Sequence, residues 1–284
     1  MSLPPPTAES TVLVTGASAG IGAELARELA RRGYPITLVA RRRERLERLA
    51  ADVEREHGVR AHVHACDLAD PQARADLVAA LQEGEREVAG LCNNAGLGTF
   101  GHFLDQDRRR ERELIEINLL AVWELTGALL PAMVARGRGA VLNVGSSAGF
   151  QPFPGHATYA ATKSFVNTFS EALHQELKGT GVTCTVLCPG PVKTEFFDSQ
   201  PAAYEAAPKP LRISAAAVAR QAVDAMVGGR RVVVPGVMAK SLVTQARFVP
   251  RSILLPIWDR VMRGVVRAEA DDQAAEPRGT SPLS

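Results

Sequence analysis

The sequence predicts an α/β protein in which about seven parallel strands form one doubly wound sheet with helices on both faces. Three observations lead to this prediction. Short apolar runs alternate along the chain with longer segments of helical periodicity. A glycine-rich turn joins the first of these runs to the first helical segment. The chain has 284 residues, 46% of them hydrophobic, which is enough for one large domain with a full core.

The composition excludes several kinds of partner and site. The 33 basic and 31 acidic residues give a net charge of +2, which argues against a nucleic-acid partner. The polar residues 1–10 are expected to form a flexible tail unlike a signal peptide, and no apolar run reaches the roughly 20 residues of a membrane-spanning helix. Four cysteines lie in apolar surroundings without metal-site spacing. We therefore expect buried thiols in a cytoplasmic protein and no metal site.

The first strand-turn-helix unit runs from Thr11 to Gly33, and its turn follows a G-x-x-x-G-x-G pattern. In such a turn the backbone N–H groups and the helix N-terminus face a phosphate, and a side chain would block that approach. An ordinary tight turn between strand and helix is the alternative interpretation. The residues expected to contact a nucleotide here are Gly16, Ser18, Ala19, Gly20, Ile21 and Gly22.

The second predicted strand ends in Ala40, Arg41 and Arg42, with no carboxylate before Glu44. An acidic residue at this position typically holds a free ribose 2′-hydroxyl, whereas arginine forks suit a phosphate. The sequence therefore favours NADP(H) over NAD(H), with Arg41 as the first candidate ligand and Arg42 as the second. Alternatively, these arginines merely begin a solvated helix.

The later units bring further polar residues to the carboxyl ends of strands. A third strand ends near Asp67 and Leu68, a helix follows from Pro71 to about Glu83, and a fourth strand ends in Asn93-Asn94-Ala95-Gly96. Ligands bind at such strand ends in open α/β sheets. A long helical segment then carries Asn118 on an apolar face, the fifth strand delivers Ser146, and the sixth ends in Pro189 and Gly190. A helix is expected to begin near Ser214, a good N-cap, before a seventh strand.

Tyr159 and Lys163 stand four residues apart at the start of an alanine-rich helical run. Positions i and i+4 share one helix face, so the ammonium can lower the tyrosine's pKa from its usual value of about 10. A tyrosine tuned in this way can pass a proton to or from an oxygen to which Ser146 also donates a hydrogen bond. A solvated helix face is the alternative for this pair.

Together these motifs resemble the short-chain dehydrogenase/reductase family between Thr11 and Gly236. The resemblance rests on TGASAGIG (15–22), CDL (66–68), NNAG (93–96), Asn118, Ser146, Tyr159-x-x-x-Lys163 and the Pro-Gly turn with Thr194. It implies a Rossmann-like NAD(P)-binding domain with Tyr159 as proton donor or acceptor. Lys163 would tune the tyrosine and hold the nicotinamide ribose, and Asn118 would bind a water that links the lysine to solvent.

The same resemblance places further residues around the cofactor. It implies contacts from Asp67, Leu68, Asn94, Ala95, Gly96, Pro189, Gly190, Val192 and Thr194. Members with this layout often form homodimers or homotetramers through the helices that carry Asn118 and Tyr159. NADP users of the family often have a basic residue inside the glycine-rich turn, where this chain has Ala19.

The substrate region is the part that the resemblance defines least. Residues 194–214 are expected to form a substrate lid, and Phe153, Phe196 and Phe197 suggest an apolar carbonyl compound such as a ketone, a 3-oxoacyl thioester or a steroid-like ketone. The sequence thus predicts an NADP(H)-dependent oxidoreductase that interconverts such a carbonyl and its secondary alcohol. A non-catalytic NADP-binding redox sensor or scaffold is the alternative.

Residues 237–267 form an apolar and basic extension beyond the last strand. We expect Leu254, Ile257, Trp258 and Val261 to cover the substrate pocket or a partner subunit. The alternative is an amphipathic segment on an anionic membrane, which would make the protein peripheral. Pro250 and Pro256 are expected to break the segment into short pieces, and the polar residues 268–284 are expected to be disordered.

Overall fold

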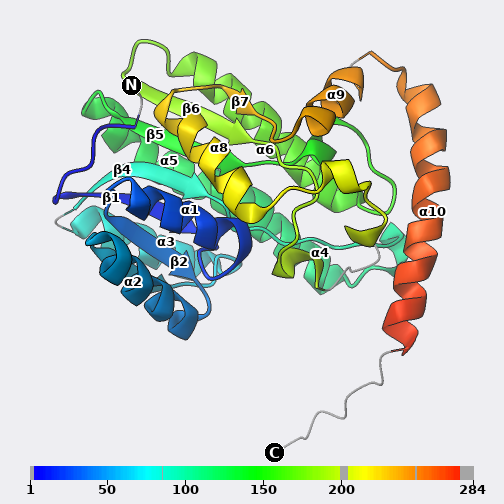
Figure 1. The fold of residues 1–284 in the computed structure, drawn as a ribbon, viewed down its shortest axis with the longest axis horizontal. Coiled ribbons are helices and arrows are strands. Elements are labelled where there is room, and N and C mark those ends of the chain that lie inside the picture. Colours follow the sequence, from blue (N-terminus) through cyan, green and yellow to red (C-terminus); the bar gives the residue numbers. More distant parts are fainter. Residues whose placement is uncertain (1–2, 85, 199–203, 247, 276–284) are drawn as a thin grey trace, which may run out of the picture.

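The computed structural model describes residues 3–84, 86–198, 204–246 and 248–275. Its centre is a parallel sheet of seven strands in the order β3-β2-β1-β4-β5-β6-β7, which confirms the predicted fold class (Figure 1). The strands are β1 (Ser10–Thr15), β2 (Ile36–Ala40), β3 (Ala61–Ala65), β4 (Glu87–Asn93), β5 (Gly139–Val144), β6 (Val182–Leu187) and β7 (Val232–Val233). The strand order reverses between β1 and β4, and ligands bind at such a switch point in open α/β sheets.

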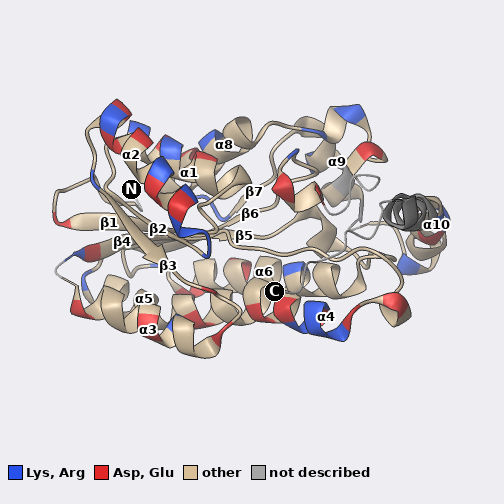
Figure 2. Cartoon of the chain, turned by 90° about the horizontal axis from the view of Figure 1, so that it is seen from below, with Lys and Arg blue, Asp and Glu red and all other residues tan. Residues whose placement is uncertain are grey.

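Helices cover both faces of the sheet (Figure 2). One face carries α1 (Gly20–Arg31), α2 (Arg43–His57) and α8 (Ala215–Val227), and the other carries α3 (Pro71–Glu83), α4 (Arg108–Ile115), α5 (Ala121–Ala135) and α6 (Ala157–Glu176). Each face has its own buried apolar cluster, because a sheet covered on both sides needs two. Two further helices, α9 (Val237–Ala246) and α10 (Arg251–Ala275), lie beyond the end of the sheet (Figure 1).

Local signals set the helix ends as predicted. Asp70 caps α3 by accepting a hydrogen bond from the Gln72 N–H, and Pro71 occupies its first position. Ser214 caps α8 by accepting from the Ala217 N–H. All four cysteines are buried, which confirms that prediction.

The helical segment around Asn118 is less regular than the sequence suggests. A π-helical turn over Glu116–Leu120 separates α4 from α5 and carries Asn118, which is fully buried. By length and hydropathy alone, Arg108–Ala135 would suit a membrane span, contrary to our expectation that no run is long enough. However, Leu125 and Met133 of this segment pack in the buried cluster beneath the sheet, so it is a core helix of the fold.

The N-terminal segment is not the free tail that its polar composition predicts. Leu3 is 1% exposed and packs in the larger core cluster, and Ser10 is already part of β1. A Cβ atom on Gly90 would lie 2.9 Å from Leu3 Cδ1, so the glycine in β4 makes room for this leucine. The predicted flexibility is therefore wrong for residues 3–10.

The C-terminal extension also differs from the prediction. Pro256 lies inside α10, which runs unbroken for 25 residues, while Pro250 directly precedes the helix. Pro256 has no backbone N–H and so removes one hydrogen bond from α10. Packing of Trp258 and Met262 against the rest of the protein stabilises the helix despite this loss. Residues 268–275 are helical rather than disordered, and residues 276–284 lie outside the described residues.

Candidate active site

A cavity of about 930 Å³ lies at the carboxyl ends of the strands, below α10. It collects nearly all the residues singled out from the sequence. The predicted residues that line it are Gly16, Ser18, Ala19, Gly20, Ile21, Arg41, Arg42, Asp67, Leu68, Asn94, Ala95, Gly96, Ser146, Tyr159, Lys163, Pro189, Gly190, Val192 and Thr194. Gly22 and Asn118 do not line the cavity but lie next to residues that do.

The glycine-rich turn has the geometry of a phosphate cradle. Gly16 and Gly20 have φ values of +65° and +56°, which other residues rarely adopt. A Cβ atom on Gly22 would lie 2.3 Å from the Gly16 carbonyl oxygen, so only glycine lets α1 approach the turn this closely. No side chain caps the N-terminus of α1, and its first N–H groups remain available to an anion. The residues present therefore fit the phosphates of a dinucleotide.

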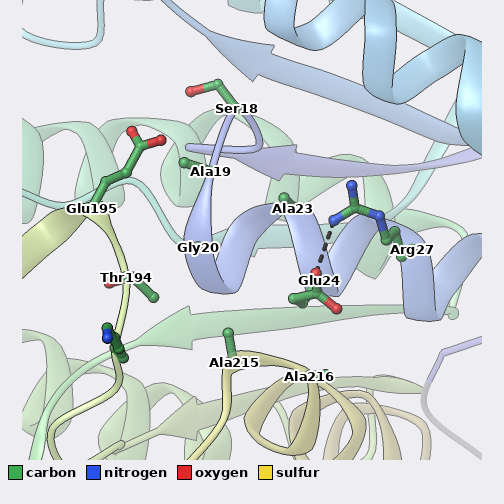
Figure 3. A pocket seen from close by; sticks show the side chains of 11 residues that line it. Ser18, Ala19, Gly20, Ala23, Glu24, Arg27, Thr194, Glu195, Ala215 and Ala216 are labelled. Atoms are coloured by element: carbon green, nitrogen blue, oxygen red, sulfur yellow. Dashed lines mark hydrogen bonds and ion pairs between the residues drawn. The ribbon is translucent and has the colours of Figure 1, made fainter.

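A second, smaller hollow of about 450 Å³ lies beside the same turn (Figure 3). Ser18 and Gly20 of the turn line it together with Thr194 and Glu195. Residues 194–214, the predicted lid, thus begin directly against the glycine-rich turn.

The predicted arginines lie at the rim of the larger cavity. Arg42 donates hydrogen bonds to Ser18 Oγ at 3.0 and 3.3 Å and forms an ion pair with Glu195 at 2.7 Å. Arg45 pairs with the same carboxylate. Arg41 instead pairs with Glu113 at 3.1 Å. Arg45 was not among the residues predicted from the sequence, although its position three residues after Arg42 puts both side chains on one side of the chain at the start of α2.

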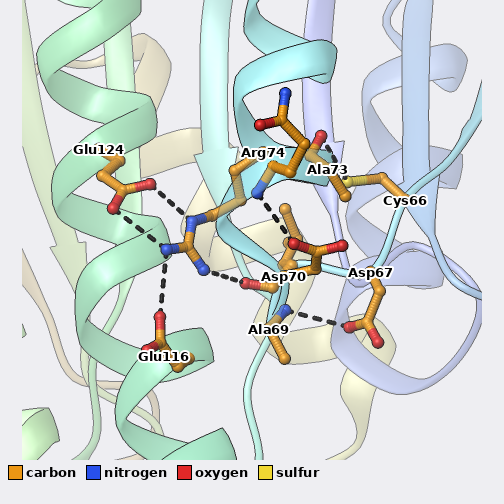
Figure 4. A network of polar contacts seen from close by, with 10 residues as sticks. Cys66, Asp67, Ala69, Asp70, Ala73, Arg74, Glu116 and Glu124 are labelled. Atoms are coloured by element: carbon orange, nitrogen blue, oxygen red, sulfur yellow. Dashed lines mark hydrogen bonds and ion pairs between the residues drawn. The ribbon is translucent and has the colours of Figure 1, made fainter.

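A buried arginine holds the loop that carries Asp67 and Leu68 (Figure 4). Arg74 is 2% exposed and donates to the Leu68 carbonyl at 2.7 Å. The same guanidinium pairs with Glu124 of α5 at 2.6 Å and with Glu116 of the π-helical turn at 3.1 Å. It therefore joins two walls of the cavity. A charged residue on a helix usually indicates a solvated face, so the burial of Arg74 could not be predicted from the sequence.

Asn94 supports the glycine-rich turn. Its Nδ2 donates to the Thr15 carbonyl at 2.9 Å, and its backbone N–H donates to Thr15 Oγ1 at 2.9 Å. This crosslink joins the end of β1 to the end of β4 and holds the switch point of the sheet together.

Ser146, Tyr159 and Lys163 meet on one wall of the cavity. Asn167 fixes the backbone of Ser146, since its Nδ2 donates to the Ser146 carbonyl at 3.0 Å. The Lys163 ammonium donates to the Val144 carbonyl at 2.7 Å and lies 5.9 Å from the centre of the Tyr159 ring. The i, i+4 spacing thus places both side chains on the same face of α6, as predicted.

The pKa shifts in this group come mainly from burial. Burial raises the pKa of Tyr159 to about 12, although a hydrogen bond with Ser146 acts in the opposite direction. Burial also lowers the pKa of Lys163 to about 8. The tyrosine shift is therefore opposite in direction to the one we predicted from the Tyr–Lys spacing, because desolvation of the phenolate dominates.

Asn118 holds the loop that follows β4. Its Nδ2 donates to the Leu97 carbonyl at 2.8 Å, and its Oδ1 accepts from the Leu97 N–H at 2.8 Å. Thr162 on α6 lies 3.3 Å from the same Nδ2. The π-helical turn thus positions the Asn118 side chain so that it bonds both the backbone N–H and the carbonyl of Leu97.

The substrate end of the cavity is aromatic and apolar. Phe196 lies 5.6 Å from the Tyr159 ring, and Trp258 of α10 lies 4.8 Å from Phe153, measured between ring centres. Leu254, Trp258 and Val261 line the cavity as predicted. Ile257 is 55% exposed and does not line the cavity, so it does not cover the pocket, and its predicted contact with a partner subunit stays a prediction. The face of α10 that carries Leu254, Trp258 and Val261 therefore packs over the pocket, which was one of the predicted roles of the extension.

One polar residue of this wall, His156, escaped the sequence analysis. It follows a Pro-Gly turn that offers no recognisable motif. Among the described residues, no cluster of side chains could hold a metal ion.

Comparisons with known proteins agree with this geometry. The sequence model of the short chain dehydrogenases matches residues 10–205. Over 187 residues the chain is 41% identical to a sulfoacetaldehyde reductase of Chromohalobacter salexigens, covering 65% of this chain and 73% of the relative. Over 175 residues it is 39% identical to a very-long-chain 3-oxoacyl-CoA reductase of Laccaria bicolor, covering 60% of this chain and 51% of the relative.

Solved structures resemble the chain over nearly its whole length. A short-chain dehydrogenase from Sphingobium yanoikuyae in complex with NADPH matches with a TM-score of 0.76 and 30% identity, covering 97% of this chain and 99% of that one. A bulky-bulky ketone specific alcohol dehydrogenase from Comamonas testosteroni matches with a TM-score of 0.73 and 26% identity, covering 98% of each chain.

The chain therefore belongs to the short-chain dehydrogenase family. It is an oxidoreductase that binds NAD(P) and interconverts carbonyl and alcohol groups.

Proposed function

We propose that this protein reduces an apolar ketone to its secondary alcohol with NADPH. One observation carries the proposal: Ser146, Tyr159 and Lys163 line the same cavity as the glycine-rich turn and an aromatic wall. Phe153, Phe196 and Trp258 suit an apolar group next to the reacting carbon. A 3-oxoacyl thioester or a steroid-like ketone also meets this description.

The residues that would hold the cofactor extend along the strand ends. Gly16, Gly20 and the N-terminus of α1 would bind its phosphates, and Asp67 and Leu68 would lie at the adenine. When bound, the nicotinamide ring supplies the hydride for reduction. The protein must orient the ketone and provide a proton for its oxygen.

Tyr159 is the proposed proton donor. A phenol with a pKa of about 12 is protonated at neutral pH, which is the state that reduction requires. Ser146 Oγ would donate a hydrogen bond to the same carbonyl oxygen and polarise it. Lys163 would stabilise the phenolate that remains after proton transfer, since a nearby cation favours the charged form.

The function is tested by following NADPH oxidation with a panel of apolar ketones. We expect turnover that depends on both NADPH and the ketone. Tight NADPH binding without turnover of any ketone would favour the alternative of a redox sensor or scaffold.

Cofactor preference gives a first prediction. Arg42→Ala and Arg41→Ala should each weaken NADPH binding by roughly 1.5–3 kcal/mol, the scale of a hydrogen bond to a charged group. NADH binding should change little, because NADH lacks the 2′-phosphate. Titration of both cofactors measures the difference. Arg43→Ala is the matched control, since Arg43 is exposed, pairs with Glu47 and does not line the cavity. Tighter binding of NADH than of NADPH by the unmodified protein would contradict the preference.

The pKa of Lys163 gives a second prediction. Because burial lowers it to about 8, the ammonium is charged below pH 8 and loses its proton as the pH rises through that value. Reductive turnover should therefore fall above about pH 8. Initial rates between pH 6 and 10, with circular dichroism to show that the fold persists, measure the effect. A flat profile through this range would show that the charge of Lys163 is not required.

Self-association is a further part of the proposal. Trp123 on α5 is 54% exposed, and Phe165 and Phe169 stack on α6 with ring centres 5.5 Å apart. These helices would pair between copies of the chain, as the family resemblance implies. Trp123→Glu should shift a dimer or tetramer toward monomer in sedimentation velocity, and an unchanged distribution would exclude this surface.

A further inference from the structure

His156 is a polar residue in an otherwise apolar part of the cavity wall. Its ring centre lies 4.5 Å from Phe100, 5.7 Å from Phe153 and 5.5 Å from the ring of Tyr159. It therefore adjoins the residue that would protonate the substrate. A phenylalanine would fill such an aromatic cluster without the cost of burying an imidazole.

The orientation of the imidazole is fixed on one side. His156 Nδ1 lies 2.7 Å from the Thr99 carbonyl oxygen, which can only accept a hydrogen bond, so Nδ1 must carry a proton. The ring is neutral because burial lowers its pKa to about 4. In this tautomer Nε2 has a free lone pair and acts as an acceptor.

The surrounding structure holds the ring in this position. The backbone N–H of His156 donates to the Phe153 carbonyl at 3.0 Å, and its own carbonyl accepts from Ala160 at 2.8 Å. Behind Thr99, the buried carboxylate of Glu111 accepts hydrogen bonds from the hydroxyls of Thr99 and Thr158. This network fixes the loop and the start of α6 relative to each other.

The Nε2 atom makes no hydrogen bond to any described residue. His156 lines the cavity, and Nδ1 is occupied by Thr99, so the Nε2 edge is the one left for a ligand. A preorganised acceptor of this kind loses little entropy when it binds a donor.

We propose that His156 forms a polar subsite that accepts, through Nε2, a hydrogen bond from a hydroxyl or amide N–H of the substrate. The substrate class is then an apolar ketone that carries a hydrogen-bond donor close to the reacting carbonyl. This inference rests on the proposed reduction at Tyr159 and adds a specificity-determining residue to it.

Paired substrates test the subsite. The probes are 2-hydroxyacetophenone and propiophenone, in which a methyl group takes the place of the hydroxyl. We expect the ratio of their kcat/KM values, hydroxyketone over ketone, to be about tenfold higher in the parent than in His156→Phe. Comparing the ratio between variants cancels the intrinsic difference in reactivity between the two carbonyls.

His174→Phe is the matched control. His174 also holds a backbone carbonyl through Nδ1, at 2.8 Å from Cys184, but it lies outside the cavity, so its replacement should leave the ratio unchanged. His156→Met provides a second apolar variant if the phenylalanine does not fit. An equal ratio in the parent and a folded His156 variant would overturn the subsite while leaving the reductase proposal intact. If the parent reduced neither these probes nor any other ketone, both proposals would fail.

Discussion

Replacing Tyr159 with phenylalanine should lower turnover by roughly 10²–10⁴-fold while leaving NADPH binding nearly unchanged. Hydride attack builds negative charge on the carbonyl oxygen, and a donor must be in place as the barrier is crossed. The substitution keeps the ring and its contacts with Phe196 and His156 and removes only the hydroxyl. Steady-state kinetics with a ketone that the parent reduces, together with NADPH titration, measure the two effects.

Two further variants complete the comparison of turnover with NADPH binding. Lys163→Ala should damage both turnover and NADPH affinity, because the ammonium would serve the phenol and the ribose. Tyr34→Phe is the matched control, since this buried tyrosine does not line the cavity, and it should retain parent turnover. Near-parent turnover of Tyr159→Phe would refute the catalytic assignment and favour the scaffold alternative.

Loss of the Arg74 guanidinium should have the largest effect on stability. Arg74→Met removes the partner of Glu116 and Glu124 and the donor to the Leu68 carbonyl. Breaking a fully buried ion pair typically costs about 3–5 kcal/mol, and about 2–4 kcal/mol is expected here because Glu124 remains partly exposed. Urea unfolding of the parent and the variant gives the difference in free energy.

The same variant should also raise the KM for NADPH, because the loop of Asp67 and Leu68 loses its anchor. Arg55→Met is the control: Arg55 pairs with Asp52 at the surface, and its loss should leave the free energy of unfolding nearly unchanged. Equal stabilities for the two variants would show that the Arg74 network contributes nothing beyond a surface ion pair.

The fold follows from the sequence wherever the pattern is local. Alternation of apolar strands with helical periods predicts the parallel sheet, and caps such as Ser214 act within one turn of the helix they begin. The burial of Leu3 depends instead on the space left by Gly90 in a strand far along the chain. The continuity of α10 through Pro256 likewise depends on tertiary contacts of Trp258, which no local propensity reveals.

The residues of the candidate site likewise fall into those with a local sequence pattern and those whose roles depend on distant segments. Backbone requirements at Gly16, Gly20 and Gly22 leave a clear pattern of glycines, and the i, i+4 relation of Tyr159 and Lys163 is set by helix geometry. Arg74 and His156 acquire their roles only because distant segments meet in space. The direction of the Tyr159 pKa shift depends on burial, which a sequence does not display.

Glu195 links the two ends of the cavity. Its carboxylate, at the start of the lid segment, occupies Arg42 and Arg45, one of which is a proposed ligand of the 2′-phosphate. A phosphate bound there competes with this carboxylate for the same guanidinium groups. If residues 194–214 act as the predicted lid, cofactor affinity and lid position are thermodynamically coupled. The coupling is then reciprocal: the factor by which NADPH changes the affinity for the substrate equals the factor by which the substrate changes the affinity for NADPH.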